Sequence, residues 1–163
     1  MKILIDTSYF LPLIKVGIEN IPDKLLIDLL SESLNIYFYS RLTLFELTAK
    51  GLKITYKGNE INPQDIRVGM DTLKNDIRLT EISFTDNPLI IELASLLKRI
   101  HNDTIDCLIF ATAISSCDCI ITMDEIFFDQ LNKSPQLKKE VKKINNNFTF
   151  WFNDLKGEPK SIE

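Results

Sequence analysis

The sequence predicts an α/β fold, a three-layer α/β/α sandwich with a mostly parallel central sheet. Strand and helix patterns alternate along most of the chain, which is typical of sheets whose strands are joined through helices. The first strand is a continuous apolar run at residues 3–5, as expected for a strand buried on both faces. The chain has no repeat, low-complexity segment or linker, so we expect one domain at residues 1–152 and a tail at 153–163.

Strands are predicted where short aliphatic or aromatic runs end in turn or capping residues: residues 2–6, 36–39, 79–83, 120–124 and 148–152. Helices are predicted where apolar residues recur at helical spacing, commonly after a capping residue: 9–14, 22–34, 41–50, 63–77, 85–101, 103–113, 125–131 and 134–145. Gly51 is a natural terminator for the helix at 41–50. Gly58-Asn59 suits a two-residue turn, so a hairpin over residues 53–61 is expected within an insertion at 52–77.

Composition limits the class of protein. The uncharged runs are too short to span a bilayer and no signal peptide is visible, so a cytoplasmic location is expected. A net charge of −4 argues against a protein that holds nucleic acid through a global basic field, although local contact stays open. Four lysines cluster near the C-terminus and could touch an RNA backbone, but a solvated helix face is the preferred interpretation: Lys138, Lys139, Lys142 and Lys143.

Cysteine and histidine offer little chemistry in this pattern. Cys107, Cys117 and Cys119 lack the spacing of zinc or redox motifs, so we interpret them as reduced packing residues. His101 is the only histidine, which excludes a mechanism that needs two imidazoles. A lone histidine ahead of a helix is more often a capping or surface residue than a catalyst.

Two acids follow predicted strands. Asp6 ends the first strand and Asp124 ends the strand at 120–124. In open α/β sheets the carboxyl ends of the strands form the edge at which ligands bind. The alternative at this stage is that Asp6 or Ser8 simply caps the helix that follows.

Two further acids stand on apolar helix faces. Glu46 shares a face with Leu42 and Phe45, and Asp106 is followed at helical spacing by apolar residues. A buried carboxylate needs a partner, because desolvating it alone costs several kcal/mol. For Asp106 a capping box with Asp103 is an equally good explanation in isolation.

If the strands are parallel neighbours, the four acids converge on one edge of the sheet. Carboxylates packed so closely repel, and protonation or bound cations must offset the repulsion. Without a histidine or cysteine ligand set, oxygen-only coordination indicates Mg²⁺ or Mn²⁺.

Together these residues resemble the PIN domain, the fold of VapC-type toxin ribonucleases and of several RNA-processing nucleases. The resemblance covers about residues 1–131 and rests on four segments: Ile3-Leu4-Ile5-Asp6-Thr7-Ser8, Phe45-Glu46, Asp106-Cys107-Leu108-Ile109-Phe110-Ala111-Thr112-Ala113 and Ile121-Thr122-Met123-Asp124.

The resemblance implies a catalytic, metal-binding quartet on an Mg²⁺ or Mn²⁺ site: Asp6, Glu46, Asp106 and Asp124. It also implies polar groups that orient a carboxylate or a water, at Thr122 and at Thr7 or Ser8. The implied reaction is hydrolysis of RNA phosphodiesters. The implied partners are an RNA substrate, a small VapB-like antitoxin and a second copy in a homodimer.

Three alternatives remain open at this stage. The first is a haloacid-dehalogenase-type phosphatase, but that class needs an acid two residues after the first, and here Ser8 occupies that place. The second is a PIN-like binding or assembly module with weak catalysis. The third is an RNA-processing nuclease without an antitoxin, which the insertion at 52–77 and the extension beyond Asp124 favour over a compact toxin.

Overall fold

The sheet is built outward from β1 (Lys2–Ile5), which pairs in parallel with β2 (Ile36–Ser40) and with β4 (Cys119–Thr122). The strand order is β3-β2-β1-β4-β5-β6, with β3 (Leu79–Ile82) beside β2 and β5 (Thr149–Phe152) beside β4. Only β6 (Lys160–Ile162) is antiparallel among the strands described. The mostly parallel α/β sheet is therefore confirmed.

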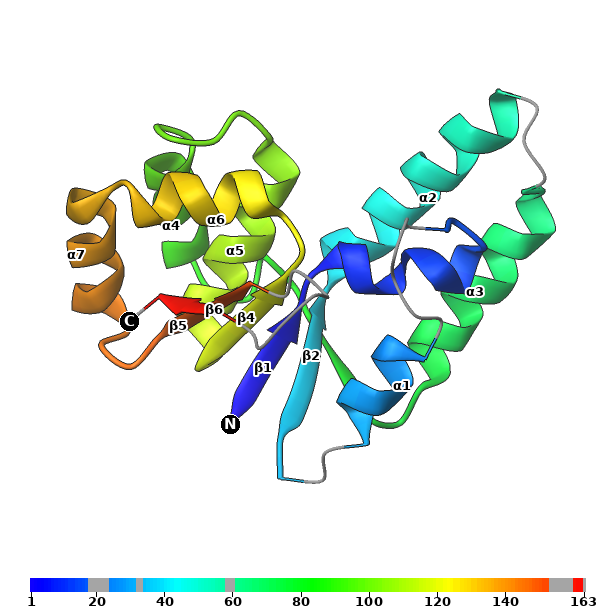
Figure 1. Ribbon diagram of the computed structural model, residues 1–163, viewed down its shortest axis with the longest axis horizontal. Helices are drawn as coiled ribbons and strands as arrows, with labels where there is room; N and C mark the ends of the chain where they lie inside the picture. Colours follow the sequence, from blue (N-terminus) through cyan, green and yellow to red (C-terminus); the bar gives the residue numbers. More distant parts are fainter. Residues whose placement is uncertain (18–23, 32–33, 58–60, 153–159, 163) are drawn as a thin grey trace.

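The structure is a computed structural model that describes residues 1–17, 24–31, 34–57, 61–152 and 160–162. Helices lie on both sides of the sheet (Figure 1). One side carries η1 (Thr7–Ile14), α1 (Leu25–Leu30), α2 (Arg41–Tyr56) and α3 (Pro63–Asn75). The other side carries α4 (Leu89–Leu97), α5 (Thr104–Ser116), α6 (Glu125–Asn132) and α7 (Pro135–Ile144).

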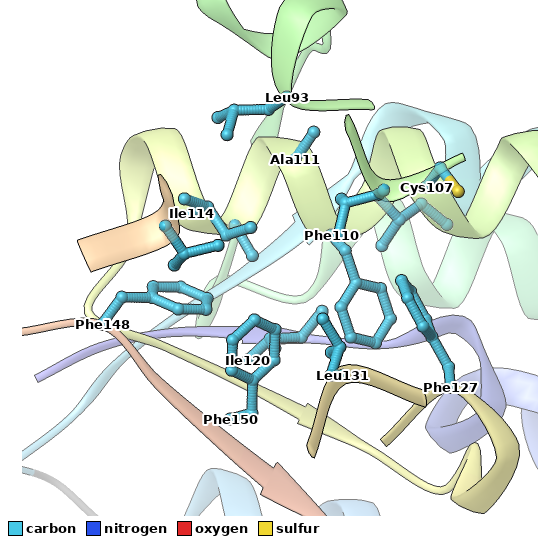
Figure 2. Close-up of a cluster of buried hydrophobic side chains, with 14 of the residues drawn as sticks. Leu93, Cys107, Phe110, Ala111, Ile114, Ile120, Phe127, Leu131, Phe148 and Phe150 are labelled. Atoms are coloured by element: carbon cyan, nitrogen blue, oxygen red, sulfur yellow. The ribbon is translucent and has the colours of Figure 1, made fainter. Parts of the chain in front are cut away.

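The pleat of β1 divides the apolar interior into two cores. Ile3 and Ile5 point into the core beneath η1, α2 and α3, whereas Leu4 points into the core beneath α4 and α5. All three side chains are fully buried, as the continuous apolar run predicts. Figure 2 shows the second core, where Phe110 of α5 packs against Phe127 of α6 and Phe150 of β5. The three cysteines are free and buried, which agrees with their interpretation as packing residues.

Gly51 does not end α2, contrary to the sequence prediction. The helix continues to Tyr56, so the hairpin expected at 53–61 is wrong over residues 53–56; residues 58–60 lie outside the described part. Gly51 is buried, and a Cβ placed there would lie 2.8 Å from the Ile66 side chain on α3. Here the missing side chain permits close approach of two helices instead of a helix stop.

Two further segments differ from expectation. The segment after Asp6 is a 3₁₀ helix, and its C-cap residue Lys15 has a φ of 58°. The end of the chain, expected to be a tail at 153–163, forms β6 over Lys160–Ile162 and pairs with β5. Within the described residues, no helix is long and apolar enough to cross a membrane.

The contact between α3 and η1 depends on Gly69. A Cβ at this position would lie 2.4 Å from the backbone oxygen of Leu13, which cannot move away as a side-chain tip can. We expect Gly69→Ala to lower the free energy of unfolding by about 1–3 kcal/mol in urea titrations, despite the helix preference of alanine. Gly17→Ala is the matched control, because nothing lies within 4 Å of its Cβ. A fully stable Gly69→Ala protein would show that the two helices do not pack this closely.

Candidate metal centre

Asp6 lies at the point where β1 and β4 end side by side. Its backbone N–H donates to the Ile121 carbonyl at 3.0 Å, which ties the residue to both strands. Its carboxylate is buried, and Oδ2 accepts hydrogen bonds from Ser8 Oγ at 2.8 Å and Thr122 Oγ1 at 3.0 Å. Asp6 makes no side-chain capping bond to η1. The simple capping explanation therefore does not account for this acid.

Burial raises the pKa of Asp6, and the nearby negative charge of Glu46 raises it further. Hydrogen bonds from Ser8, Thr122 and the Thr7 backbone act in the opposite direction but do not cancel the effect. The Thr7 hydroxyl itself donates to Thr43 Oγ1 at 3.2 Å. Of the polar groups predicted to orient an acid, Thr122 and Ser8 contact Asp6 through their hydroxyls, whereas Thr7 does so only through its backbone.

Glu46 reaches the same place from the first half of α2, whose N-terminus is capped by Ser40. Its side chain is mostly buried, and its two oxygens have different surroundings. Oε1 pairs with Lys50 Nζ at 2.5 Å, whereas Oε2 is buried without a hydrogen-bond partner among the residues described.

Lys50 carries the positive charge nearest to Glu46. Burial lowers its pKa, but the hydrogen bond and charge of Glu46, together with the charges of Asp6 and Asp106, raise the pKa overall. The ammonium therefore lies in the field of three acids on different elements. Lys50 follows Glu46 by four residues on the predicted helix, but it was not among the site residues predicted from the sequence; only the structure shows the pair beside the other acids.

Asp106 enters from the first turn of α5. Asp103 is the N-cap of that helix and accepts from the N–H groups of Ile105 and Asp106. The Asp106 carboxylate instead faces His101, with 3.0 Å between Oδ2 and Nε2. Burial raises the pKa of Asp106 to about 6; the hydrogen bond with His101 lowers it, and the charges of Asp6, Asp103 and Glu46 raise it.

His101 is part of this cluster, so its expected role as a surface or capping residue is wrong. The imidazole is buried, stacks on Phe127 with 4.2 Å between ring centroids, and places Nδ1 2.9 Å from Gln130 Oε1. Burial lowers the pKa of His101, but its contacts with Asp106 and Gln130 and the charge of Asp124 raise it overall. No local pattern could reveal this role, because the groups around the ring lie on two helices, α5 and α6, and in the loop before α6.

Asp124 completes the group from the loop after β4. Its carboxylate caps α6 by accepting from the Phe127 N–H at 2.8 Å, and its own N–H donates to Thr122 Oγ1 at 3.0 Å. Ligating atoms of His101, Asp106 and Asp124 all lie within 4.8 Å of one another. Thr122 thus joins Asp6 and Asp124 through one hydroxyl.

These residues have the donor set that a divalent cation needs. Four carboxylates share one edge of the sheet, and one buried oxygen, Glu46 Oε2, has no partner to replace the water lost on burial. Carboxylate oxygens favour Mg²⁺ or Mn²⁺, as the sequence predicts. Elsewhere, a surface pocket of about 580 Å³ between α4 and α7 is lined by residues such as Leu96 and Lys139 and contains none of the four acids.

Comparison with known protein families identifies the family of this chain. The model of the PIN domain matches residues 3–133. The chain belongs to the PIN domain family. PIN domains are generally nucleases, and such nucleases generally use a divalent metal ion. No curated protein matches the sequence.

Two solved structures share the PIN fold. One is VapBC2 from Rickettsia felis bound to a DNA fragment from their promoter, with 18% identity, coverage of 91% of this chain and 96% of that chain, and a TM-score of 0.54. The other is FitAcB from Neisseria gonorrhoeae, with 19% identity, coverage of 80% and 93%, and a TM-score of 0.52. At these identities the likeness establishes the three-layer fold.

The raised pKa of Asp106 predicts how pH affects stability without metal. The native state binds the Asp106 proton more tightly than the unfolded chain, so wild type loses unfolding free energy as pH rises from about 4 through 6. Asp106→Asn has no carboxyl group to titrate at this position, so its unfolding free energy does not fall for this reason as pH rises. We expect the variant to gain about 1–2 kcal/mol relative to wild type between pH 4.5 and pH 7.5, measured by urea unfolding with EDTA present.

Asp129→Asn is the matched control, because Asp129 is an exposed acid on α6 that pairs only with Lys133 among the described contacts. Its stability difference from wild type should stay nearly constant over the same pH range. If Asp106→Asn instead became progressively less stable than wild type as pH rose, Asp106 would be a structural carboxylate.

Proposed function

We propose that this PIN domain is a metal-dependent endoribonuclease that hydrolyses RNA phosphodiester bonds. The observation that carries the proposal is the proximity of the acids: Asp106 lies in the field of Asp6 and Glu46, and Asp124 is linked to Asp6 through the Thr122 hydroxyl. No phosphate could approach such a concentration of negative charge unless a cation reversed the local sign. Membership of the PIN family supports a nuclease over the other metal-dependent enzymes.

In this proposal the four acids hold Mg²⁺ or Mn²⁺. A bound divalent cation supplies positive charge for the phosphoryl oxygens and lowers the pKa of a water molecule. Thr122 and Ser8 hold Asp6 Oδ2 in one orientation through their hydroxyls. Products would carry a 5′ phosphate and a 3′ hydroxyl.

Lys50 supplies a second positive charge at the same edge. Its pairing with Glu46 Oε1 leaves Oε2 for the cation, so the two positive charges do not compete for one oxygen. The lysines of α7 contribute less: Leu137 and Val141 bury one face of that helix, Lys143 pairs with Glu140, and Lys138 donates to Asn132. The solvated-face interpretation of this cluster is retained.

Removing one proposed ligand tests this function. Asp6→Asn preserves volume and should reduce Mn²⁺-dependent cleavage of a single-stranded RNA by at least about 100-fold, because ligand loss weakens both metal binding and charge stabilisation. The rise in melting temperature caused by Mn²⁺ in wild type should disappear, while the circular dichroism spectrum is unchanged.

Asp129→Asn is the control and should keep both the Mn²⁺-dependent RNA cleavage and the Mn²⁺-dependent rise in melting temperature. A wild-type protein that shows neither a Mn²⁺-dependent rise nor RNA cleavage would support the alternative of a PIN-like binding or assembly module. Cleavage that persists in Asp6→Asn would exclude the proposed ligand set.

A toxin of a toxin–antitoxin pair is the more specific form of this proposal, favoured by one surface feature. Three apolar residues on one face of α2 are exposed: Phe45 by 62%, Leu52 by 51% and Tyr56 by 93%. The face adjoins Glu46 and would suit a VapB-like antitoxin that covers the acidic edge, with a homodimer as the assembled form. The apolar residues of η1, by contrast, are buried or half-buried, so that helix offers no such surface.

Expression of the chain alone in a bacterial host tests the toxin assignment. Wild type should arrest growth, whereas Asp6→Asn should be tolerated at the same protein level. Sedimentation velocity of Asp6→Asn should show a dimer. Tolerated expression of active wild-type nuclease would favour an RNA-processing enzyme without an antitoxin.

A further inference from the structure

The orientation of the His101 ring determines which nitrogen faces the acids. Nδ1 lies 2.9 Å from Gln130 Oε1, and an amide oxygen can only accept a hydrogen bond. Nδ1 therefore carries the proton, and in the neutral imidazole the lone pair belongs to Nε2. Stacking on Phe127 fixes the ring plane, so the Nε2 lone pair is directed at the carboxylates.

This arrangement is the one that metal-binding histidines commonly use. Such a histidine donates its other ring N–H to an oxygen, which sets the tautomer and the ring orientation. Here Gln130 provides that oxygen from α6, the same helix that Asp124 caps. The carboxylate and the amide that bracket the imidazole therefore come from two different helices and hold it from both sides.

The spacing of the donor atoms also fits one coordination shell. Two ligands about 2.1 Å from an ion and at right angles to each other are about 3.0 Å apart, and opposite ligands are about 4.2 Å apart. His101 Nε2 and Asp106 Oδ2 are 3.0 Å apart, and Asp124 adds an atom within 4.8 Å of both. The three atoms match the spacing of donors around a single cation with little rearrangement.

Without a cation, the contact between Nε2 and Asp106 needs a proton, because a lone pair and a carboxylate oxygen otherwise repel each other. The same position can be taken by a divalent ion, which attracts both atoms at once. The surrounding charges of Asp6 and Glu46 favour the ion with the larger charge. His101 Nε2 and Asp106 Oδ2 are thus close enough to share one divalent ion.

We propose that His101 Nε2 is a metal ligand at this centre, beside Asp106 and Asp124, and that it makes the site selective for Mn²⁺ over Mg²⁺. The inference rests on the metal site of the proposed function but goes beyond its four carboxylates. Imidazole nitrogen is a good ligand for transition metals and a poor one for Mg²⁺, which prefers oxygen. The mixed nitrogen–oxygen set then accounts for a buried histidine beside these acids.

The single histidine makes a direct test possible. Mn²⁺-loaded wild type would be studied by electron spin-echo envelope modulation, once at natural abundance and once with only histidine labelled with ¹⁵N. Because His101 is the only histidine, a ¹⁴N modulation that changes to the ¹⁵N pattern must come from its ring. This is the expected result, and it requires neither RNA nor turnover.

A variant tests the proposed selectivity for Mn²⁺ over Mg²⁺. His101→Phe keeps a flat ring to stack on Phe127 but has no donor atom. We expect its Mn²⁺ affinity, measured calorimetrically, to fall about 10–100-fold while its Mg²⁺ affinity changes by less than about threefold. Asp129→Asn is again the control and should bind both ions as wild type does.

Bound Mn²⁺ without histidine modulation would overturn this inference and leave His101 as a positioning residue for Asp106. It would leave the proposed nuclease intact. Failure of wild type to bind Mn²⁺ at all would overturn both proposals. Histidine-coordinated Mn²⁺ in a protein that cleaves no RNA would overturn only the proposed function.

Discussion

Repulsion among carboxylates at the carboxyl edge of β1 and β4 is the constraint on which the site depends. The parallel register of the two strands brings their ends together, and Asp6 is bound there through its backbone to Ile121. Two helices from opposite sides of the sheet then direct Glu46 and Asp106 toward the same place. A fold that only needed stability would not gather these charges, because each desolvated carboxylate works against folding.

Neighbouring groups offset this repulsion from several sides. Lys50 neutralises one oxygen of Glu46, His101 faces Asp106, and two hydroxyls donate to Asp6. These contacts leave Glu46 Oε2 unsatisfied, and they leave the pKa values of Asp6 and Asp106 raised. The repulsion among these acids is therefore offset only in part by the neighbouring side chains.

The switch in strand order explains why the site lies where it does. β1 is followed along the chain by β2 on one side and is flanked by β4 on the other, so helices leave the two strand ends in different directions. The loops after β1 and β4 consequently border an open edge that α2 and α5 approach from opposite faces. Phe127 and Gln130 of α6 then close the side that carries His101.

Much of the fold followed from the sequence, because its signals are local, and the four acids proposed as the site were selected in the same way. Apolar runs and capping residues marked β1, β2, β4 and α5. Asp6 and Asp124 were selected because they end predicted strands, and Glu46 and Asp106 because they stand on apolar helix faces. Local signals misled where packing overrides them. Gly51 has the residue type of a helix stop, but its role depends on Ile66 of a separate helix, and the predicted C-terminal tail forms β6 because β5 offers an open edge.

The sequence by itself determined the α/β class, the ends of the buried strands and the four acids, since hydrophobic periodicity and residue chemistry act over a few residues. Only the tertiary structure decided that His101 joins those acids, and that the Glu46–Lys50 pair of α2 lies beside Asp6 and Asp106. His101 contacts Gln130, which lies 29 residues away in the sequence, and Asp106, which lies five residues away. Such contacts depend on how helices cross and pack. The spacing of residues along the chain does not predict that packing.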